Sequence, residues 1–178
     1  MTRETEFENI MHGIMNDKSI ENLIDLGFLK APASTKYHYS FEGGLYEHSF
    51  NVMRALQNLT DRLNLEWQRK ESPIIVSMLH DLCKADLYIP NINNTWLHNP
   101  NPIIKGHGTK SVIYIQQYTN IKLTDEEIAC ITYHMGAFTP QEEWNDYTNA
   151  VHKYPNVLWT HTADMYASHI YEIEDEQK

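Results

Sequence analysis

The chain has few of the features that mark secreted, disulfide-stabilised or membrane proteins. Its only two cysteines, Cys83 and Cys130, form neither a disulfide framework nor a CxxC metal knuckle. Both lie in apolar helical surroundings, where a buried, reduced thiol is expected. No apolar run reaches the roughly 18–20 residues that cross a bilayer, so no membrane span is expected. The acidic N-terminus, Met1 to Glu8, does not resemble a signal or transit peptide, which favours a cytoplasmic location.

Positive charge is also scarce. The chain has 14 lysines and arginines against 24 aspartates and glutamates, a formal net charge of −10, and no run of basic residues. Proteins that grip long nucleic acid usually present a basic face, so such a partner is not expected. The charge favours a small anionic substrate, or the end of a strand, bound at a local site. An acidic exterior slows the approach of such a substrate, so the site itself must supply positive charge.

Length and hydrophobic pattern favour one helical domain. A chain of 178 residues with 42% hydrophobic residues can build one sizeable core and is short for two. No segment alternates over enough residues to predict a strand. We therefore expect a compact all-α bundle of about seven or eight helices over residues 1–178, with N-terminal helices in 1–30 packed on it. The expected helices cover residues 3–16, 19–29, 45–63, 74–84, 108–118, 124–135, a segment beginning at 139–140, and 156–171. The second of them is expected to end before Gly27 or shortly after it.

Local signals set several of these boundaries. Ser72 is expected to cap a helix that has Pro73 at its first position. Thr124 and Glu127 have the spacing of a capping box, and Asn156 is expected to cap the last helix. Residues 87–105 contain three prolines and several asparagines, which predicts a surface loop or lid.

Ionisable side chains occur on apolar helical faces. His48 lies on the face of Leu45 and Val52, where it can be a core histidine bonded to backbone or a ligand. His80 and Asp81 follow the apolar run 74–79, which predicts a helix buried on most sides.

A carboxylate in such a place costs several kcal/mol unless it meets a cation or a full set of donors. Asp164 repeats the pattern within the apolar segment 157–165. Side chains on separate helices of a bundle can converge on one ion, although a purely structural internal His–Asp pair is the alternative.

His107 and His134 extend the candidate set. His107 lies between Gly106 and Gly108, and His134 ends a predicted helix. Each can be a cap or a surface residue. Together with Asp81 they can instead hold a second ion, and two-metal sites suit phosphate ester hydrolysis.

The order of these residues resembles the signature of the HD phosphohydrolase superfamily, which is all-α and metal-dependent. Residues 32–49, which end in Gly43-Gly44-Leu45-Tyr46-Glu47-His48-Ser49, are similar to the opening segment of HD domains in certain bacterial 3′–5′ exoribonucleases. The His-Asp-x-x-Lys form is matched by His80-Asp81-Leu82-Cys83-Lys84. Later positions of those domains, and of HD-type diadenosine tetraphosphate hydrolases, resemble Gly106-His107-Gly108, Tyr133-His134-Met135-Gly136 and Ala163-Asp164. Members with fuller dinuclear sites often have two adjacent histidines where Tyr133-His134 stands here.

The resemblance implies one or two divalent ions, with iron, manganese, nickel, zinc and magnesium all open. The first ion would be held by His48, His80, Asp81 and Asp164, and the second by Asp81, His107 and His134. The metal is expected to activate water and to neutralise phosphoryl oxygens. Asp81, Lys84 and His107 are the expected catalytic residues. Lys84 is expected to contact phosphate, against the alternative of a solvated lysine at a helix end.

Further substrate contacts are expected around these residues. Lys105 and Lys110 flank His107 and are either phosphate contacts or ordinary surface lysines. Tyr88 and Trp96 lie in the insertion, where they can stack on a base or anchor the loop. His38 and His161 are expected to orient ligands or substrate.

The expected function is hydrolysis of a nucleotide or a related small phosphoester or phosphoanhydride. The chain has no companion nucleic-acid-binding domain, so exoribonuclease activity does not follow from the resemblance. Trimming of short oligonucleotides in the 3′–5′ direction is one alternative, and a non-catalytic nucleotide-sensing module is another. The partner is expected to be a small phosphorylated molecule, with no membrane, and an oligomer remains open.

Overall fold

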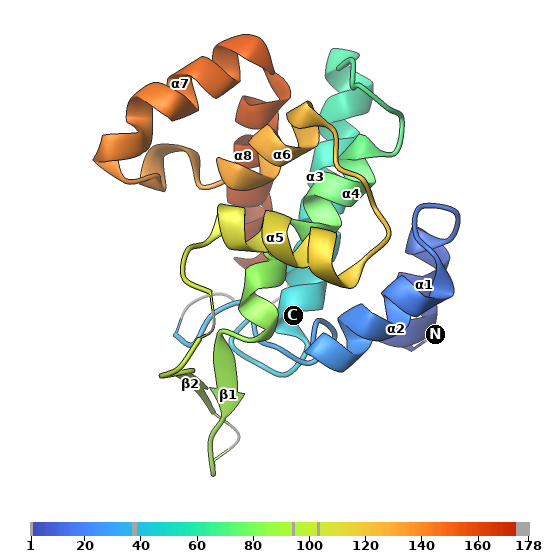
Figure 1. Cartoon of the computed structure of the whole chain (residues 1–178), viewed down its shortest axis with the longest axis vertical. Helices are drawn as coiled ribbons and strands as arrows, with labels where there is room; N and C mark the ends of the chain where they lie inside the picture. The colour runs from blue at the N-terminus through green and yellow to red at the C-terminus, as the bar shows by residue number, and fades with distance from the viewer. Residues whose placement is uncertain (1, 37–38, 94, 103, 174–178) are drawn as a thin grey trace.

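The structure is a computed structural model that describes residues 2–173 except 37, 38, 94 and 103. The described residues contain eight α-helices and a single small sheet of two strands, which confirms the predicted all-α class (Figure 1). No described helix is both long enough and apolar enough to span a bilayer. In chain order the helices are α1 (Arg3–Met11), α2 (Asp17–Leu26), α3 (Gly44–Leu63), α4 (Ser72–Leu79), α5 (Gly108–Tyr118), α6 (Asp125–Thr132), α7 (Trp144–Lys153) and α8 (Asn156–Tyr166).

The centre of the bundle is formed by α3, α4, α6 and α8. Helix α3 packs against α4 and α8, α6 packs against both α4 and α8, and α5 lies across α6 (Figure 1). The facing side chains are almost completely buried; they include Leu45, Val52, Leu56, Ile75, Met78, Leu79, Ile131, Val157 and Ala163. Each large apolar side chain buried in this way stabilises the fold by about 1.5–3 kcal/mol.

The first of the two N-terminal helices is shorter than predicted, and the second begins earlier than predicted but ends before Gly27, as one of the two predicted ends has it. Helix α1 ends at Met11 rather than at 16, because a turn follows in which Gly13 has φ +80°. Helix α2 begins two residues earlier than expected, where the Asn16 side chain accepts a hydrogen bond from the Ser19 amide. It ends at Leu26, because Gly27 adopts a left-handed conformation with φ +103°.

Helix α4 ends before the His-Asp doublet, so the predicted helix 74–84 is interrupted. His80 is its C-cap, and Asp81 leaves helical geometry at φ −104° and ψ 16°. The chain continues as the short 3-10 helix η1 (Leu82–Ala85). The prediction of Ser72 as N-cap is wrong: Glu71 occupies that position, and the Ser72 hydroxyl donates to Glu127 at 2.8 Å.

The insertion contains a small hairpin where only a loop was expected. Strands β1 (Tyr88–Pro90) and β2 (Trp96–His98) pair antiparallel, with Tyr88 opposite His98. Three residues per strand are too few for alternation to reveal them in the sequence. The hairpin is tied to the bundle at Asp86, whose carboxylate accepts hydrogen bonds from Lys110 and from the Tyr114 hydroxyl.

In the C-terminal third, one capping prediction is confirmed, whereas a second capping prediction and one predicted helix start are wrong. The Thr124–Glu127 capping box is present at the start of α6. The segment expected to begin a helix at 139–140 forms a 3-10 turn first, and α7 begins at Trp144. Asn156 is the first residue of α8 rather than its cap, and its side-chain amide donates to Glu66 and Glu126 instead. Helix α8 continues into the π-helical segment η4 (Ala167–Tyr171).

Candidate metal centre

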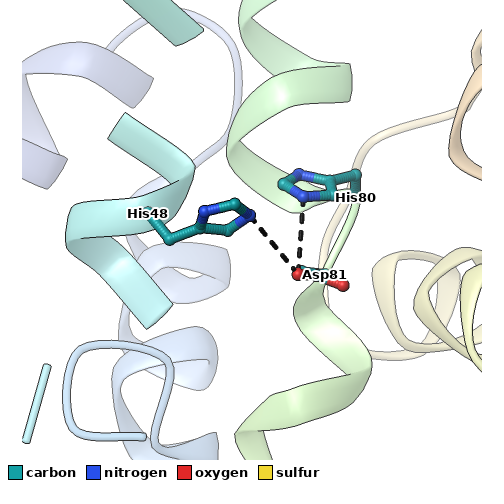
Figure 2. A group of neighbouring side chains, drawn as sticks. All are labelled: His48, His80 and Asp81. Atoms are coloured by element: carbon teal, nitrogen blue, oxygen red, sulfur yellow. Dashed lines mark ion pairs between the residues drawn. The ribbon is translucent and has the colours of Figure 1, made fainter. Parts of the chain in front are cut away.

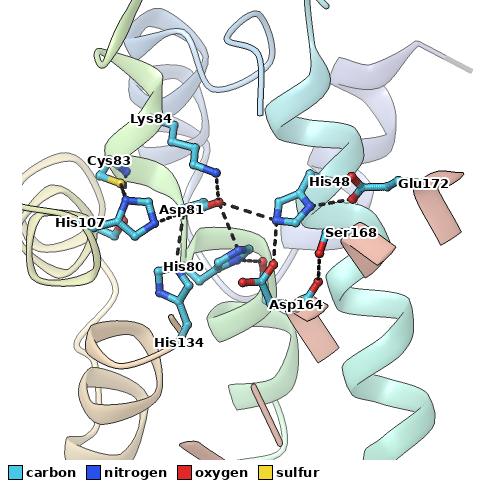
Figure 3. Close-up of polar contacts among 12 residues, drawn as sticks. His48, His80, Asp81, Cys83, Lys84, His107, His134, Asp164, Ser168 and Glu172 are labelled. Carbon is cyan, nitrogen blue, oxygen red and sulfur yellow. Dashed lines mark hydrogen bonds and ion pairs between the residues drawn. The ribbon is translucent and has the colours of Figure 1, made fainter. Parts of the chain in front are cut away.

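Five histidine and aspartate side chains gather around Asp81, although they come from separate parts of the chain (Figure 3). Figure 2 shows two of them, His48 and His80, with Asp81. His48 belongs to α3, His80 ends α4, His107 precedes α5, His134 follows α6, and Asp164 belongs to α8. The Nε2 atoms of the four histidines lie 2.9–3.7 Å from Asp81 carboxylate oxygens. The shortest of these distances is from His107 and the longest from His48. Asp164 Oδ1 lies 3.2 Å from His48 Nε2. The structure therefore brings together all six side chains that the sequence suggested as ligands.

The other ring nitrogen of each histidine faces away from this centre. His80 Nδ1 lies 2.7 Å from the Ser77 carbonyl, and His134 Nδ1 lies 2.7 Å from the Ile131 carbonyl. A carbonyl oxygen can only accept, so both rings carry their proton on Nδ1. Each ring thereby satisfies a carbonyl of the last helical turn, which has no partner within the helix. In both rings Nε2 is left as a lone pair directed at Asp81.

The atoms at the centre lack the hydrogen bonds that buried polar atoms normally make. Among the described residues, Asp81 Oδ1 and the Nε2 atoms of His80, His107 and His134 are buried without a hydrogen bond. Lone pairs gathered around a carboxylate repel one another, and leaving buried polar groups unpaired costs about 1–3 kcal/mol each. A cation relieves every one of these costs at once, because imidazole nitrogen and carboxylate oxygen are its ordinary ligands. The donor set thus fits a divalent metal ion.

The described residues contain three overlapping groups of potential metal ligands, and the ligand atoms of each group lie within 4.8 Å of one another. They are His48 with His80 and Asp81, His80 with His134 and Asp164, and Asp81 with Cys83 and His107. The first group shares His80 with the second and Asp81 with the third, so the three groups adjoin one another around a single centre. The last group adds the Cys83 thiol, which lies 3.3 Å from His107 Nδ1.

The charges of the centre are strongly coupled. Burial alone would lower the pKa of His48, but the Asp164 and Glu172 carboxylates beside it raise that pKa to about 10. Burial lowers the pKa of His80. Burial would raise the pKa of Asp81, yet Lys84 and the neighbouring imidazoles hold it well below its usual range. Asp164 has a lowered pKa for a similar reason, its main partner being His48. Both carboxylates are therefore ionised at neutral pH.

A cavity of about 270 Å³ opens onto this cluster. Lys84 reaches it from η1, with Nζ 2.6 Å from Asp81 Oδ2 and a side chain only 12% exposed. The cavity wall combines ionic and apolar residues: His48, Asp81, Lys84, His107, Met135, Phe138, His161, Asp164, Met165, Ser168 and His169. Its outer part includes Phe138, which is 65% exposed.

The other residues expected to bind substrate are not among the described residues that line this cavity. Lys110 is only 1% exposed and its ammonium group is paired with Asp86. Lys105 is exposed to solvent, and Tyr88 and Trp96 belong to the hairpin. Trp96 lines a separate hollow beside residues 40–42. Of the two residues expected to orient ligands, His161 lines the cavity and donates from Nδ1 to the His134 carbonyl, whereas His38 lies outside the described residues.

Sequence reasoning missed two contributors to the site, Glu172 and Phe138. Glu172 accepts a hydrogen bond from His48 Nδ1 at 2.7 Å, and it lies in an acidic C-terminal stretch where it does not stand out (Figure 3). Phe138 follows His134 by four residues and has no periodic pattern around it. Cys83 was expected to be an inert buried thiol; its pKa is raised to about 12 by burial and by Asp81, which agrees with that expectation.

Comparisons with known proteins give one informative similarity. A dihydroneopterin 2′,3′-cyclic phosphate phosphodiesterase of Methanocaldococcus jannaschii is 28% identical to this chain over 97 residues. The matched region covers 51% of this chain and 39% of that protein. No family model matches the chain, and no solved structure matches it. Together with the buried histidine–aspartate cluster, the similarity supports a metal-dependent phosphoester hydrolase at the general level.

Proposed function

We propose that this protein is a metal-dependent phosphohydrolase of the HD superfamily that acts on a nucleotide or a related small phosphoester or phosphoanhydride. The observation that carries the proposal is the convergence of the His80, His107 and His134 Nε2 atoms on Asp81, all buried without hydrogen bonds. The similarity to a phosphodiesterase of a small phosphorylated pterin supports the same class of chemistry.

In this proposal His48, His80, Asp81 and Asp164 hold a first ion, and Asp81, His107 and His134 hold a second. A divalent cation, when bound there, supplies Lewis acidity and positive charge beside a phosphoryl group. Asp81 has one oxygen toward His107 and His134 and the other toward His48 and His80, which suits a shared ligand. His107, the most exposed of these imidazoles at 31%, is the residue of the set nearest to entering substrate.

Lys84 is the proposed phosphate contact. Its ammonium group borders both Asp81 and the cavity, so it can donate to a phosphoryl oxygen without moving far. Asp81 raises the pKa of Lys84 in spite of burial, which keeps the ammonium charged at neutral pH. This fixed positive charge gives an anionic substrate a favourable place in a protein whose formal net charge is −10.

Apolar residues at the outer part of the cavity are proposed to hold the organic part of the substrate. Met135, Phe138 and Met165 line it together, and Phe138 exposes most of its ring. A planar heteroaromatic ring can stack on such a surface while the phosphate group reaches the ionic end. Nucleotides and phosphorylated pterins both have this combination of a flat ring and a phosphate.

A substrate screen tests the proposal. The metal-loaded protein is offered nucleoside 2′,3′-cyclic phosphates, dinucleoside polyphosphates, nucleoside mono- and triphosphates, and a short RNA, and hydrolysis products are separated by chromatography. We expect turnover of at least one small substrate that requires metal and is lost in Asp81→Asn. Turnover of the RNA alone would replace the proposal with oligonucleotide trimming. Tight binding of one compound with no turnover of any would replace it with a nucleotide sensor.

A further inference from the structure

His48 differs from the other three imidazoles of the centre in the partner of its second nitrogen. The Nδ1 atoms of His80 and His134 donate to backbone carbonyls, and that of His107 lies beside the Cys83 sulfur. His48 Nδ1 instead lies 2.7 Å from Glu172 Oε1. Within the described part of the chain, His48 is therefore the imidazole of this set that faces an anion on each side, Glu172 at Nδ1 and Asp164 at Nε2 (Figure 3).

Glu172 is itself a costly residue for the fold. Its side chain is 1% exposed, and its Oε2 has no hydrogen bond among the described residues. Taking a carboxylate out of water costs several kcal/mol, and the ion pair that the structure gives Glu172 is the one with His48. The cost of burying Glu172 indicates that its contact with the His48 imidazole has a role at the centre.

The π-helical segment η4 brings Glu172 to this position. Glu172 follows Asp164 by eight residues, which in an uninterrupted α-helix would turn it about 80° away from Asp164 around the axis. A π turn accommodates one extra residue, and removing its rotation of about 100° leaves the two carboxylates only about 20° apart. Residues Ala167–Tyr171 form that turn, directly between Asp164 and Glu172. One helix thus presents two carboxylates to the two nitrogens of a single ring.

We propose that Glu172 is a positioning residue for His48 and sets the affinity of the centre for a divalent cation. Its carboxylate holds the proton of His48 on Nδ1, directs Nε2 toward Asp81 and Asp164, and increases the electron density of the ring. Outer partners of this kind typically change metal affinity by about 10–100-fold. The inference rests on the proposed metal-dependent function, and it assigns a role to a residue outside the ligand set.

The experiment measures Mn²⁺ binding by isothermal titration calorimetry for the wild-type protein, Glu172→Gln and Glu172→Ala. Glutamine is isosteric and can still accept the Nδ1 proton, so it removes charge alone, whereas alanine removes the acceptor. We expect affinity to fall by more than twofold and up to about 10-fold in Glu172→Gln, and by about 10–100-fold in Glu172→Ala. Glu47→Gln is the matched control, because it removes one negative charge beside His48 from a residue that is bonded to Arg3 at the surface. We expect Glu47→Gln to bind Mn²⁺ as the wild-type protein does.

A second readout is independent of affinity. In metal-free protein labelled with ¹⁵N-histidine, the two nitrogen shifts of His48 report which nitrogen carries a proton. We expect a protonated Nδ1 in the wild-type protein and a loss of that proton in Glu172→Ala, where Asp164 beside Nε2 is the carboxylate that remains.

The outcomes separate this role from the proposed function. If the wild-type protein binds no Mn²⁺ or Zn²⁺, the metal-dependent function itself fails. If the wild-type protein binds metal and Glu172→Gln and Glu172→Ala bind it within about twofold of wild type, only the role of Glu172 is overturned. A variant that loses folding stability but not metal binding would show a lower melting temperature at unaltered affinity for Mn²⁺. That result also contradicts the proposal. Because Glu172→Gln preserves shape, it decides the question even if Glu172→Ala does not fold.

Discussion

Replacing Asp81 with asparagine perturbs the centre of the cluster with the smallest change of shape. The Asp81 carboxylate lies within 3.7 Å of side-chain nitrogens from His48, His80, His107, His134 and Lys84. Asparagine keeps the volume but removes the negative charge and places N–H donors among these groups. We expect two separate losses, one in the metal-free protein and one in metal binding.

The first loss comes from Lys84. Its ammonium lies 2.6 Å from Asp81, and its side chain is 12% exposed. Removing one partner of a buried ion pair costs about 3–5 kcal/mol, and the residual exposure of Lys84 places the expected cost at about 3 kcal/mol. In a chain of this size each kcal/mol moves the melting temperature by about 2–4 °C. Metal-free Asp81→Asn should therefore melt about 6–12 °C below the wild-type protein.

The second loss is the stabilisation that a bound metal provides. At a metal concentration 1,000 times the dissociation constant, binding to the folded state adds about 4 kcal/mol, or about 8–16 °C. The wild-type protein should show this gain with Mn²⁺, and Asp81→Asn should show almost none at the same concentration. Circular-dichroism melting curves with and without Mn²⁺ measure both losses. If Asp81→Asn gained as many degrees from Mn²⁺ as the wild-type protein does, the assignment of Asp81 as the shared ligand would be wrong.

Three further predictions concern other parts of the molecule. Phe138→Ala should raise KM for ring-bearing phosphates by about 5–150-fold and leave kcat nearly unchanged, since base–aromatic stacking is worth about 1–3 kcal/mol. An equal loss of kcat would contradict a pure binding role. Arg69→Met should lower the free energy of unfolding, measured by urea titration, by about 3 kcal/mol, because the fully buried Glu127 loses both hydrogen bonds from Arg69. A loss below about 1 kcal/mol would contradict this role of Arg69. Cys83 and Cys130 should resist iodoacetamide in the native protein at pH 8 and react with it in urea. Both thiols are buried, and burial raises the pKa of each, that of Cys83 to about 12. Rapid modification of either thiol in the native protein would refute this prediction.

Much of the helical framework could be predicted, because its signals are local. The capping box at Thr124 and the apolar face of α3 follow from residue types at short spacing, and both are present in the structure. The break after Leu79 could not be predicted, because the apolar run 74–79 carries no helix-ending residue before His80. The hairpin at 88–98 could not be predicted either, because each of its strands is only three residues long.

The candidate ligands could also be predicted, but their surroundings could not. His48, Asp81 and Asp164 stand out in sequence because ionisable side chains on apolar faces need a partner. Glu172 does not stand out, because it becomes buried only through the π turn that precedes it. Lys110 misleads for the opposite reason: its position beside His107 suggests a phosphate contact, whereas the fold turns its side chain to Asp86. The assignment of residues 1–178 to a single domain stays a prediction.

The central claim is that a metal ion sits among side chains that come together only in the folded bundle. X-ray diffraction from crystals grown with Mn²⁺, recorded where manganese scatters anomalously, locates the ion directly. We predict an anomalous peak within bonding distance of His48, His80, Asp81 and Asp164. A well-ordered crystal with no peak there, or with its peak elsewhere on the molecule, would contradict the claim.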